Sequence, residues 1–260
     1  MPGTSEHGAI ALAVIGGTGL YRLAALGEVE TLEGDTIYGA PSGPVRVGRI
    51  GGHAVAFLAR HGEGHSLPPH KVNYRANLRR LADLGARRVL AVNAVGGITV
   101  AYGPRVVAVP DQLIDYTWGR VSTVCEEPGT EVVHVDFGDP YTPSLRAAVL
   151  RAAAAAGVAV VGGGCHGVTQ GPRLETRAEV ERLRRDGCDV VGMTSMPEAA
   201  LAREMGLDYA CLALVANWAA GCGAVAGGPA AAEITMDEVL GNVEAASAGL
   251  PALLERLLEG

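Results

Sequence analysis

The sequence predicts an α/β fold with a mixed sheet, and three observations support this. Short apolar runs alternate with helical patterns along the whole chain of 260 residues, the order expected of strands and helices packed in layers. Hydrophobic residues make up 48% of the chain but aromatic residues only 4%, so Ala, Val and Leu must form the core. Composition does not break between residues 9 and 260, which favours one domain. A short polar tail, residues 1–8, precedes it and is expected to be disordered.

The expected elements follow from apolar runs and from helix start and stop signals. Six runs are typical of buried strands: residues 10–15, 55–58, 89–92, 158–161, 189–191 and 209–216. Five helical patterns separate or follow them: residues 69–84, 143–156, 175–186, 197–205 and 235–257. Thr142 and Pro143 offer an N-cap and a proline at the first helical position. Thr235 and Glu238 form a capping box at the start of the last helix, and a glycine follows each of the first four patterns.

Charge and cysteine usage narrow the class of protein. The net charge of −7 argues against nucleic acid or an anionic membrane surface as a partner, so any bound anion must be held by a local cluster. Five scattered cysteines are typical of reduced thiols in a cytoplasmic protein. The sequence contains neither a signal peptide nor an apolar run of the ~18 residues that a membrane span requires. The Gly/Ala/Pro-rich stretch 221–232 is interpreted as a flexible loop over a site or a tolerated insertion.

Residues suited to binding an anion follow three of the expected strands. The glycine-rich segment 15–19 contains Thr18 and lets the backbone approach an anion closely. Arg60 and His61 supply a planar guanidinium and an imidazole donor, both suited to phosphate. The segment 93–97 offers further backbone amides. Each segment alone is also compatible with an ordinary turn or a surface basic pair, because none matches G-x-G-x-x-G or a P-loop.

Later segments add groups suited to a sugar and a base. Thr194 follows the strand 189–191 and could donate to the anion, while Met193 offers an apolar face to a sugar ring or simply fills the core. Glu175 begins a helix whose dipole favours an acidic residue there in any case. Asn217 ends the strand 209–216. Because ligands of open α/β sheets bind beyond the carboxyl ends of the strands, we expect these groups to share one pocket.

A metal site is the competing interpretation of the histidines. His61, His65 and His70 lie close together in the sequence, but their spacing matches neither H-E-x-x-H nor a Cys/His zinc pattern. No metal is therefore expected.

Together these segments resemble the trimeric purine nucleoside phosphorylase and methylthioadenosine phosphorylase family. The matching pieces, in the family's order, are residues 15–20, 60–62, 65–69, 71–77, 171–176 and 192–194 and the strand that ends at Asn217. The resemblance covers nearly the whole chain. It implies an α/β phosphorylase fold around a mixed, barrel-like sheet and reversible phosphorolysis of a purine nucleoside. It also implies inorganic phosphate as co-substrate with no other cofactor, and a homotrimer, with pairing of trimers left open.

The resemblance also assigns site residues by position. The phosphate site comprises Thr18, Arg60, His61, Asn93, Ala94 and Thr194. Met193 is the ribose contact, and Asn93 stands where the methylthioadenosine enzymes carry Thr. His65 and His134 match positions near the 5′ end of the sugar, the second of which comes from a neighbouring subunit in the family.

The base end favours a 6-oxopurine. Asn217 can accept a hydrogen bond from N7–H and donate to O6, whereas methylthioadenosine phosphorylases carry Asp there and a second Asp where this chain has Ala219. Glu175 can accept from N1–H, a proton that hypoxanthine has and adenine lacks, so selectivity against adenine is expected. Leu174 replaces a base-stacking aromatic of the family, and Trp218 is expected beside the base. Asn217, Glu175 and His61 are the expected catalytic residues.

The sugar end favours an apolar 5′ substituent. Purine nucleoside phosphorylases place a His near the start of the last helix to meet the 5′-hydroxyl, but this chain has Met236, with Val239 and Leu240 one turn later. Met236 is also compatible with packing of the helix start. A contact of methylthio size is worth roughly 1–3 kcal/mol.

The two ends together favour 5′-methylthioinosine as substrate. A general 6-oxopurine nucleoside phosphorylase and a methylthioadenosine phosphorylase are the nearest alternatives. A nucleoside hydrolase and a non-catalytic purine-binding protein are more distant ones.

Overall fold

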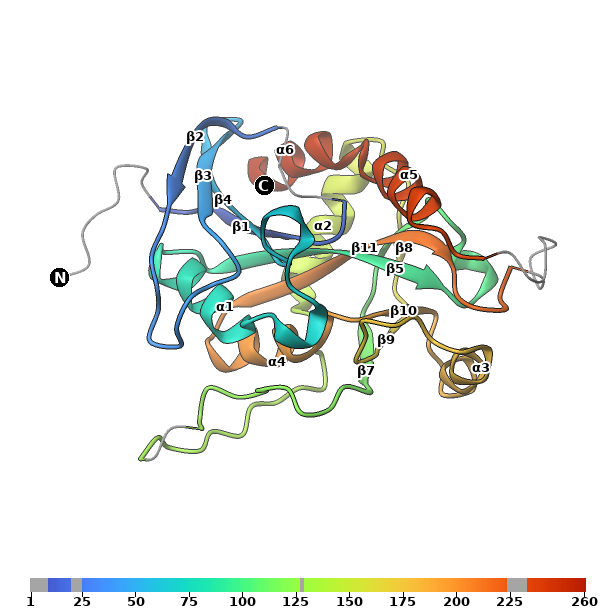
Figure 1. The fold of residues 1–260 in the computed structure, drawn as a ribbon. Helices are drawn as coiled ribbons and strands as arrows, with labels where there is room; N and C mark the ends of the chain where they lie inside the picture. The colour runs from blue at the N-terminus through green and yellow to red at the C-terminus, as the bar shows by residue number, and fades with distance from the viewer. Residues whose placement is uncertain (1–8, 20–24, 127–128, 224–232) are drawn as a thin grey trace.

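A mixed sheet organises the chain (Figure 1). The computed structural model describes residues 9–19, 25–126, 129–223 and 233–260; the expected N-terminal tail and residues 224–232 of the Gly/Ala-rich stretch lie outside them. Within these residues the sheet has eleven strands. They are β1 Leu12–Gly16, β2 Gly27–Leu32, β3 Val45–Ile50, β4 His53–Ala59, β5 Arg88–Gly97, β6 Val107–Val109, β7 Gln112–Asp115, β8 Val161–Gly162, β9 Cys165–Val168, β10 Val190–Gly192 and β11 Asp208–Trp218.

The long central strand β5 determines the topology. One edge of β5 pairs in parallel with β1 over its first half and antiparallel with β10 at Gly96 and Gly97, while β11 pairs in parallel along its other edge. From β1 the sheet continues through β4, β3 and β2, and from β10 through β9 and β7; β11 leads to β6 and β8. The expectation of a mixed sheet is confirmed, and the strand path branches at β5.

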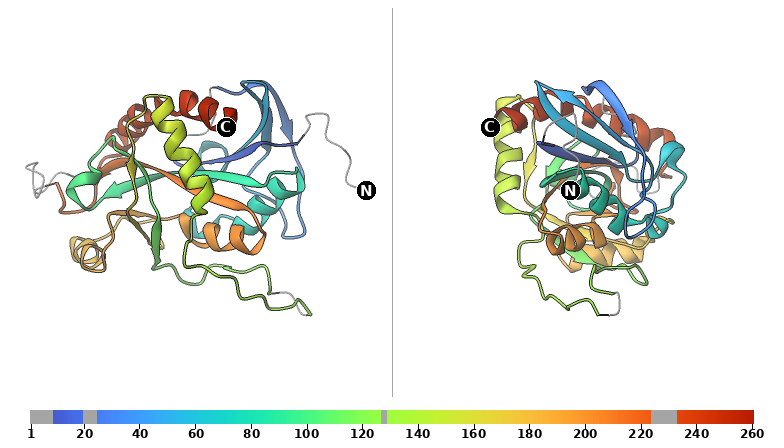
Figure 2. Two further views of the ribbon diagram at one scale, coloured as in Figure 1. Left: turned by 180° about the vertical axis from the view of Figure 1, so that it is seen from behind. Right: turned by 90° about the vertical axis from the view of Figure 1, so that its left-hand side faces the viewer.

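Helices cover both faces of the sheet (Figures 1 and 2). Helices α1 (Tyr74–Asp83) and α4 (Ser195–Glu204) lie on one face, and α2 (Pro143–Ala155), α5 (Met236–Ser247) and α6 (Leu250–Glu259) on the other. Helix α3 (Arg177–Arg185) packs on a smaller cluster beside the end of the sheet. Three short 3-10 helices, η1 Glu63–His65, η2 Pro69–Lys71 and η3 Val100–Tyr102, lie in connections.

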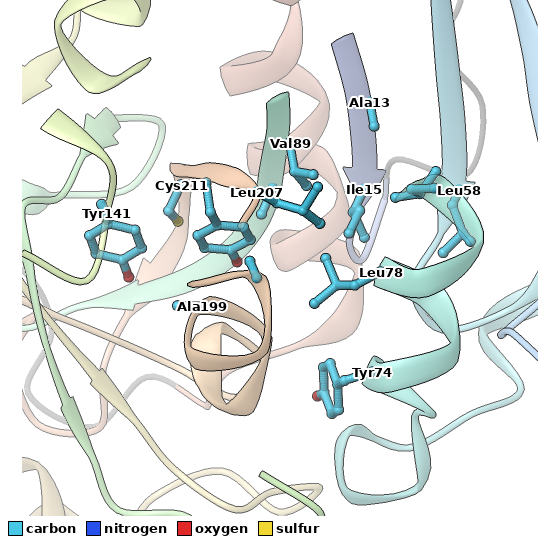
Figure 3. Close-up of a cluster of buried hydrophobic side chains, with 14 of the residues drawn as sticks. Ala13, Ile15, Leu58, Tyr74, Leu78, Val89, Tyr141, Ala199, Leu207 and Cys211 are labelled. Carbon is cyan, nitrogen blue, oxygen red and sulfur yellow. The ribbon is translucent and has the colours of Figure 1, made fainter. Parts of the chain in front are cut away.

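The two faces are filled by alternate residues of the same strands. In β1, Leu12 and Val14 pack towards α2, α5 and α6, whereas Ala13 and Ile15 pack towards α1 and α4. Figure 3 shows the apolar cluster between the sheet and helices α1 and α4, in which Ile15 faces Leu78 of α1. All five residues of β1 are buried, which explains why this strand appears as a continuous apolar run rather than an alternating one.

Several expected elements are corrected by the structure. Only Val161 of the expected strand 158–161 lies in a strand; Val158 instead packs against the junction of α5 and α6 at Gly249. The expected last helix is two helices, because Pro251 near the start of α6 cannot continue a helix from the preceding turn. Thr142 does not cap α2 with its side chain; its hydroxyl accepts from the backbone N–H of Tyr209. Strands β2, β3, β6, β7 and β9 were not expected: β2 is exposed, and β6, β7 and β9 have at most four residues.

A half-buried arginine holds the long connection between β7 and α2 against the body of the protein. The Arg120 guanidinium donates to the carbonyl oxygens of Met193 and Met196, at 2.8 and 2.6 Å, and of Gln170 at 2.8 Å. Beyond Arg120 the connection runs away from the body and back (Figures 1 and 2). Arg120 therefore ties this connection to two segments, one at Gln170 and one at 193–196.

No helix in the described residues is long and apolar enough to cross a membrane.

Candidate active site

The carboxyl ends of five strands meet at one cavity. Strands β1, β4, β5 and β11 run in the same direction, so the residues that end them lie at one edge of the sheet. Strand β10 runs antiparallel to β5, with Val191 opposite Gly96, so its carboxyl end reaches back along β5. This reversal brings Met193 and Thr194 to the same cavity as Ala94, and the cavity has a volume of about 410 Å³.

Most of the residues expected at the site line this cavity. They are Thr18, Arg60, His61, His65, Ala94, Leu174, Glu175, Met193, Thr194, Asn217, Ala219, Met236 and Val239. They come from segments that span most of the chain, from β1 to α5. In the part of the chain that the structure describes, no three His, Cys, Asp or Glu residues are grouped to hold a metal ion.

Four expected site residues lie outside the lining. Asn93 is 2% exposed and lies behind the cavity wall. Trp218 follows Asn217 in the same strand and therefore points to the opposite face, where its ring lies next to Gly103. Leu240 lies next to Gly19 on the exposed side of α5, and His134 is exposed on the extended connection between β7 and α2. Within one chain, these four residues do not form the cavity surface.

A buried ion pair fixes the arginine that lines the cavity. Arg60 is fully buried, and its Nε and Nη2 each lie 2.8 Å from an oxygen of Glu198. Tyr209 donates to the same carboxylate at 2.8 Å. Burial alone would lower the pKa of Arg60, but the charge and hydrogen bonds of Glu198 outweigh burial and raise it. The guanidinium is therefore a fixed, permanently charged donor group.

One N–H of Arg60 remains for a ligand. Nη1 donates to the Val92 carbonyl at 3.2 Å, and Nη2 donates to the side-chain oxygen of Asn93 at 3.2 Å. With the two bonds to Glu198, these engage four of the five N–H groups within the described residues. A Cβ on Gly17 would lie 3.1 Å from Nη1 and 2.7 Å from the Val92 carbonyl. Glycine at position 17, which lines the cavity together with Arg60, therefore keeps a side chain from crowding Nη1.

His61 differs from the expected imidazole donor. Its Nδ1 lies 2.8 Å from the carbonyl of Leu67, and since a carbonyl only accepts, Nδ1 carries a hydrogen. Burial, followed by the charge of Arg60, lowers the pKa of His61 to about 4. The ring is thus neutral near pH 7, and its Nε2 is an acceptor. The Nε2 of such a ring can accept a hydrogen bond from a phosphate hydroxyl, and it donates only after it has been protonated.

A carboxylate and an amide also line the cavity, Glu175 and Asn217. Thr169 donates to Oε1 of Glu175, and burial raises the pKa of Glu175 while the Thr169 hydrogen bond lowers it. Asn217 is 8% exposed and donates from Nδ2 to the carbonyl of Trp218 at 2.8 Å. This bond fixes the amide and leaves Oδ1 and the second Nδ2 hydrogen for a ligand. Ala219, 4% exposed, adds no polar group.

The remaining wall is largely apolar. Met236 and Val239 come from the start of α5, where Thr235 accepts a hydrogen bond from the backbone N–H of Glu238 and so caps the helix. The rings of His61 and His65 are stacked with centroids 4.4 Å apart. Met236 is 62% exposed, so this end of the cavity opens to solvent in the single chain.

Sequence reasoning missed the groups that support the lining. Glu198 lies on α4 and Ser195 at its start, both fully buried, and Thr169 lies behind Glu175. Glu198 had a sequence signal, because it is an acidic residue within the apolar stretch 196–202 and a buried arginine needs a carboxylate. Thr169 and Ser195 had none, since single hydroxyls are common in any position.

A substitution of Glu198 tests how much the buried ion pair contributes to stability. Glu198→Gln keeps the side-chain shape but leaves Arg60 without a countercharge, so we expect a loss of about 3–5 kcal/mol in the free energy of unfolding. Inorganic phosphate should restore part of this loss, because an anion beside Arg60 compensates its charge. Urea denaturation with and without phosphate measures both effects.

The control for this test is Glu181→Gln, since Glu181 pairs with arginines on the exposed side of α3. It should leave the free energy of unfolding close to that of wild type. A Glu198→Gln protein as stable as Glu181→Gln, with or without phosphate, would contradict the role given to the ion pair.

Comparison with known proteins identifies the family. Residues 11–259 match the model of the phosphorylase superfamily. A probable S-methyl-5′-thioinosine phosphorylase from Xanthomonas campestris pv. campestris is 70% identical, with 96% of this chain and 98% of that protein covered. A protein of the same name from Xylella fastidiosa is 64% identical, with 95% and 98% covered.

A solved structure gives the same result for the fold. The methylthioadenosine phosphorylase from an antarctic soil metagenomic library superposes with a TM-score of 0.86 at 36% identity, with 96% of this chain and 86% of that chain covered. The match over nearly the whole chain, in sequence and in fold, establishes that this protein belongs to the phosphorylase superfamily.

Proposed function

We propose that the protein catalyses the phosphate-dependent, reversible cleavage of S-methyl-5′-thioinosine to hypoxanthine and 5-methylthioribose 1-phosphate. The observation that carries the proposal is one cavity lined both by Asn217 and Glu175 and by Arg60, His61 and Thr194. The names of the 70% and 64% identical relatives, both probable S-methyl-5′-thioinosine phosphorylases, support the same reaction.

Hydrogen-bond complementarity supports a 6-oxopurine as the base. The free Oδ1 of Asn217 can accept from N7–H, and its second Nδ2 hydrogen can donate to O6. The carboxylate of Glu175 can accept from N1–H. Adenine has no hydrogen at N1, so it would leave a half-buried carboxylate unpaired. The apolar Ala219 offers nothing to a 6-amino group.

The apolar wall at α5 supports a 5′-methylthio substituent. Met236 and Val239 border the cavity there, and neither can hydrogen-bond a 5′-hydroxyl. Inosine would therefore lose the apolar contact and leave its hydroxyl to water, a preference worth roughly 1–3 kcal/mol. Inosine is a slower substrate under this proposal and is not excluded.

The chemistry requires only charge stabilisation at both ends of the ribose. As the bond between C1′ and N9 breaks, its electron pair moves onto the purine, whose N7 takes up a proton from water. Asn217 would stabilise the departing base by accepting from that N7–H and donating to O6, while Glu175 would hold the base through N1–H. A phosphate oxygen then forms the new bond to C1′. Arg60, Thr18 and Thr194 would hold that phosphate, and the neutral His61 would accept a hydrogen bond from its hydroxyl, whose proton the product phosphate releases to water. Met193 would contact the ribose.

We further propose a cytoplasmic homotrimer. The connection between β7 and α2 carries Val132 and Val133, 66% and 53% exposed, beside the exposed His134. Burying these valines against a second chain would deliver His134 to a neighbouring cavity, at the end where Met236 is open to solvent. Light scattering on a size-exclusion column should give three times, or for paired trimers six times, the chain mass of 26.6 kDa. A monomer of full activity would contradict this.

A change at Asn217 tests the assignment of the base. Wild-type protein should release hypoxanthine from methylthioinosine faster than it cleaves inosine or methylthioadenosine, and only when phosphate is present. Asn217→Asp replaces the donor to O6 with an acceptor that suits a 6-amino group. The ratio of kcat/KM for methylthioadenosine to that for methylthioinosine should rise by roughly tenfold or more.

The control for this experiment is Asn242→Asp, in which a buried asparagine that binds the Ala216 carbonyl is changed outside the cavity lining. Its substrate ratio should stay that of wild type. Base release without phosphate would favour a hydrolase, and an unchanged ratio in Asn217→Asp would refute the assignment of the base.

The raised pKa of Glu175 predicts the acid limit of activity. The carboxylate form accepts from N1–H, so activity should be present above the pKa of Glu175 and should fall as pH drops through it. Because burial raises this pKa, the fall should begin at a higher pH than for an ordinary glutamate. Thr169→Val removes a hydrogen bond that lowers the pKa, so the acid limb of kcat/KM should move to still higher pH.

Thr169→Ser keeps the hydroxyl and should restore the wild-type profile. An acid limb that stays in place in Thr169→Val would mean that Glu175 does not control it.

A further inference from the structure

A buried asparagine connects Arg60 to the cavity wall. Asn93 lies in the middle of β5 and is 2% exposed. Its Oδ1 lies 3.2 Å from Nη2 of Arg60, and its Nδ2 lies 3.0 Å from Oγ1 of Thr194 and 3.2 Å from Oγ of Ser195. All the polar atoms of this amide are thus engaged inside the protein, which corrects the expectation that Asn93 binds phosphate directly.

Chemistry fixes which way this amide is oriented. The guanidinium of Arg60 has donors only, so it must face the oxygen of Asn93 and not the nitrogen. The two hydrogens of Nδ2 then point to the hydroxyls of Thr194 and Ser195. The permanent charge of Arg60 therefore sets the direction of both hydrogen bonds on the far side of Asn93.

Each hydroxyl that accepts from Asn93 must donate elsewhere. Ser195 Oγ lies 3.1 Å from Nδ1 of His166, a fully buried ring that is neutral near pH 7 because burial lowers its pKa to about 4. Nδ1 can accept the Ser195 hydrogen. Thr194 borders the cavity. With its oxygen accepting from Asn93, its hydrogen is free to point into that cavity.

We infer that Asn93 is a positioning residue that makes the Thr194 hydroxyl an obligate donor to the bound anion. The inference rests on the proposed function, because it assigns inorganic phosphate to the end of the cavity beside Arg60. Arg60 thereby acts on the anion twice. It offers its own Nη1 hydrogen, and through Asn93 it turns a second hydrogen towards the same place.

The test reverses the direction of the hydrogen bond between residue 93 and Thr194 and keeps the shape of the side chain. Asn93→Asp presents an oxygen to Thr194, so the Thr194 hydrogen turns back to the carboxylate and away from the cavity. Loss of a hydrogen bond to a charged ligand costs roughly tenfold to a hundredfold in affinity. We expect at least that rise in the Kd of inorganic phosphate by isothermal titration calorimetry and in its KM, with the KM of the nucleoside within about twofold of wild type.

A double-mutant cycle separates hydroxyl direction from added charge. Thr194→Val removes the hydroxyl and should weaken phosphate by roughly tenfold or more, whereas Thr194→Ser should bind it as wild type does. In the Thr194→Val background only the charge of the introduced carboxylate remains to act. Asn93→Asp should therefore weaken phosphate less in that background than in wild type. Equal factors in both backgrounds would overturn the inference.

A matched control comes from α1. Asn77 is also fully buried, accepts from the Ser42 backbone and donates to the Ser42 hydroxyl at 2.9 Å, and does not border the cavity. Asn77→Asp should leave the Kd of phosphate unchanged even if it lowers stability. If it weakens phosphate as much as Asn93→Asp does, the effect is general destabilisation and the inference fails.

The readouts distinguish this inference from the proposed function. If Asn93→Asp does not fold, the Thr194 variants still decide, because a Thr194→Val protein that binds phosphate as wild type does contradicts the inference. If wild type binds phosphate but releases no hypoxanthine, the proposed reaction fails while the calorimetric comparison of Thr194 variants still tests the inference.

Discussion

The positive charge of Arg60 is buried, and the neighbouring structure is arranged around it. The carboxylate of Glu198 balances the charge of the guanidinium and accepts two hydrogen bonds from it. Tyr209 of β11 donates a third hydrogen bond to the same carboxylate. The pair links Arg60, which directly follows β4, to Glu198 of α4. A buried pair of this kind adds little net stability compared with apolar packing, but losing either partner is costly. Its value here is that a fixed cation borders the cavity in a single orientation.

The direction of one strand makes the cavity possible. If β10 ran parallel to β5, its carboxyl end would extend beyond the end of β5. The Thr194 hydroxyl could then not lie 3.0 Å from Nδ2 of Asn93, in the middle of β5. The antiparallel pairing instead turns the segment 193–195 back over the middle of β5. A ligand in the cavity is thereby enclosed by segments from distant parts of the chain, and Arg120 ties two of them to the connection that leads to His134.

Protonation states differ among the groups that line the cavity. The Arg60 cation and the neutral imidazole of His61 lie side by side, and the charge of Arg60 helps to keep His61 neutral. At Glu175, burial raises the pKa of the carboxyl group and the hydrogen bond from Thr169 opposes that rise. Met193 and Met236 add apolar surface to the same lining.

The sequence by itself determined the fold class, the principal buried strands and most of the cavity lining. Apolar runs and the polar residues that end them are local features, and parallel strands bring their ends together. Only the tertiary structure decided the antiparallel pairing of β10 and the side of β11 to which Trp218 points. It alone revealed Glu198, and it moved Asn93 from the lining to a place behind it. Those facts depend on contacts between side chains 33 to 138 residues apart in the chain, and on hydrogen-bond directions that no single segment contains.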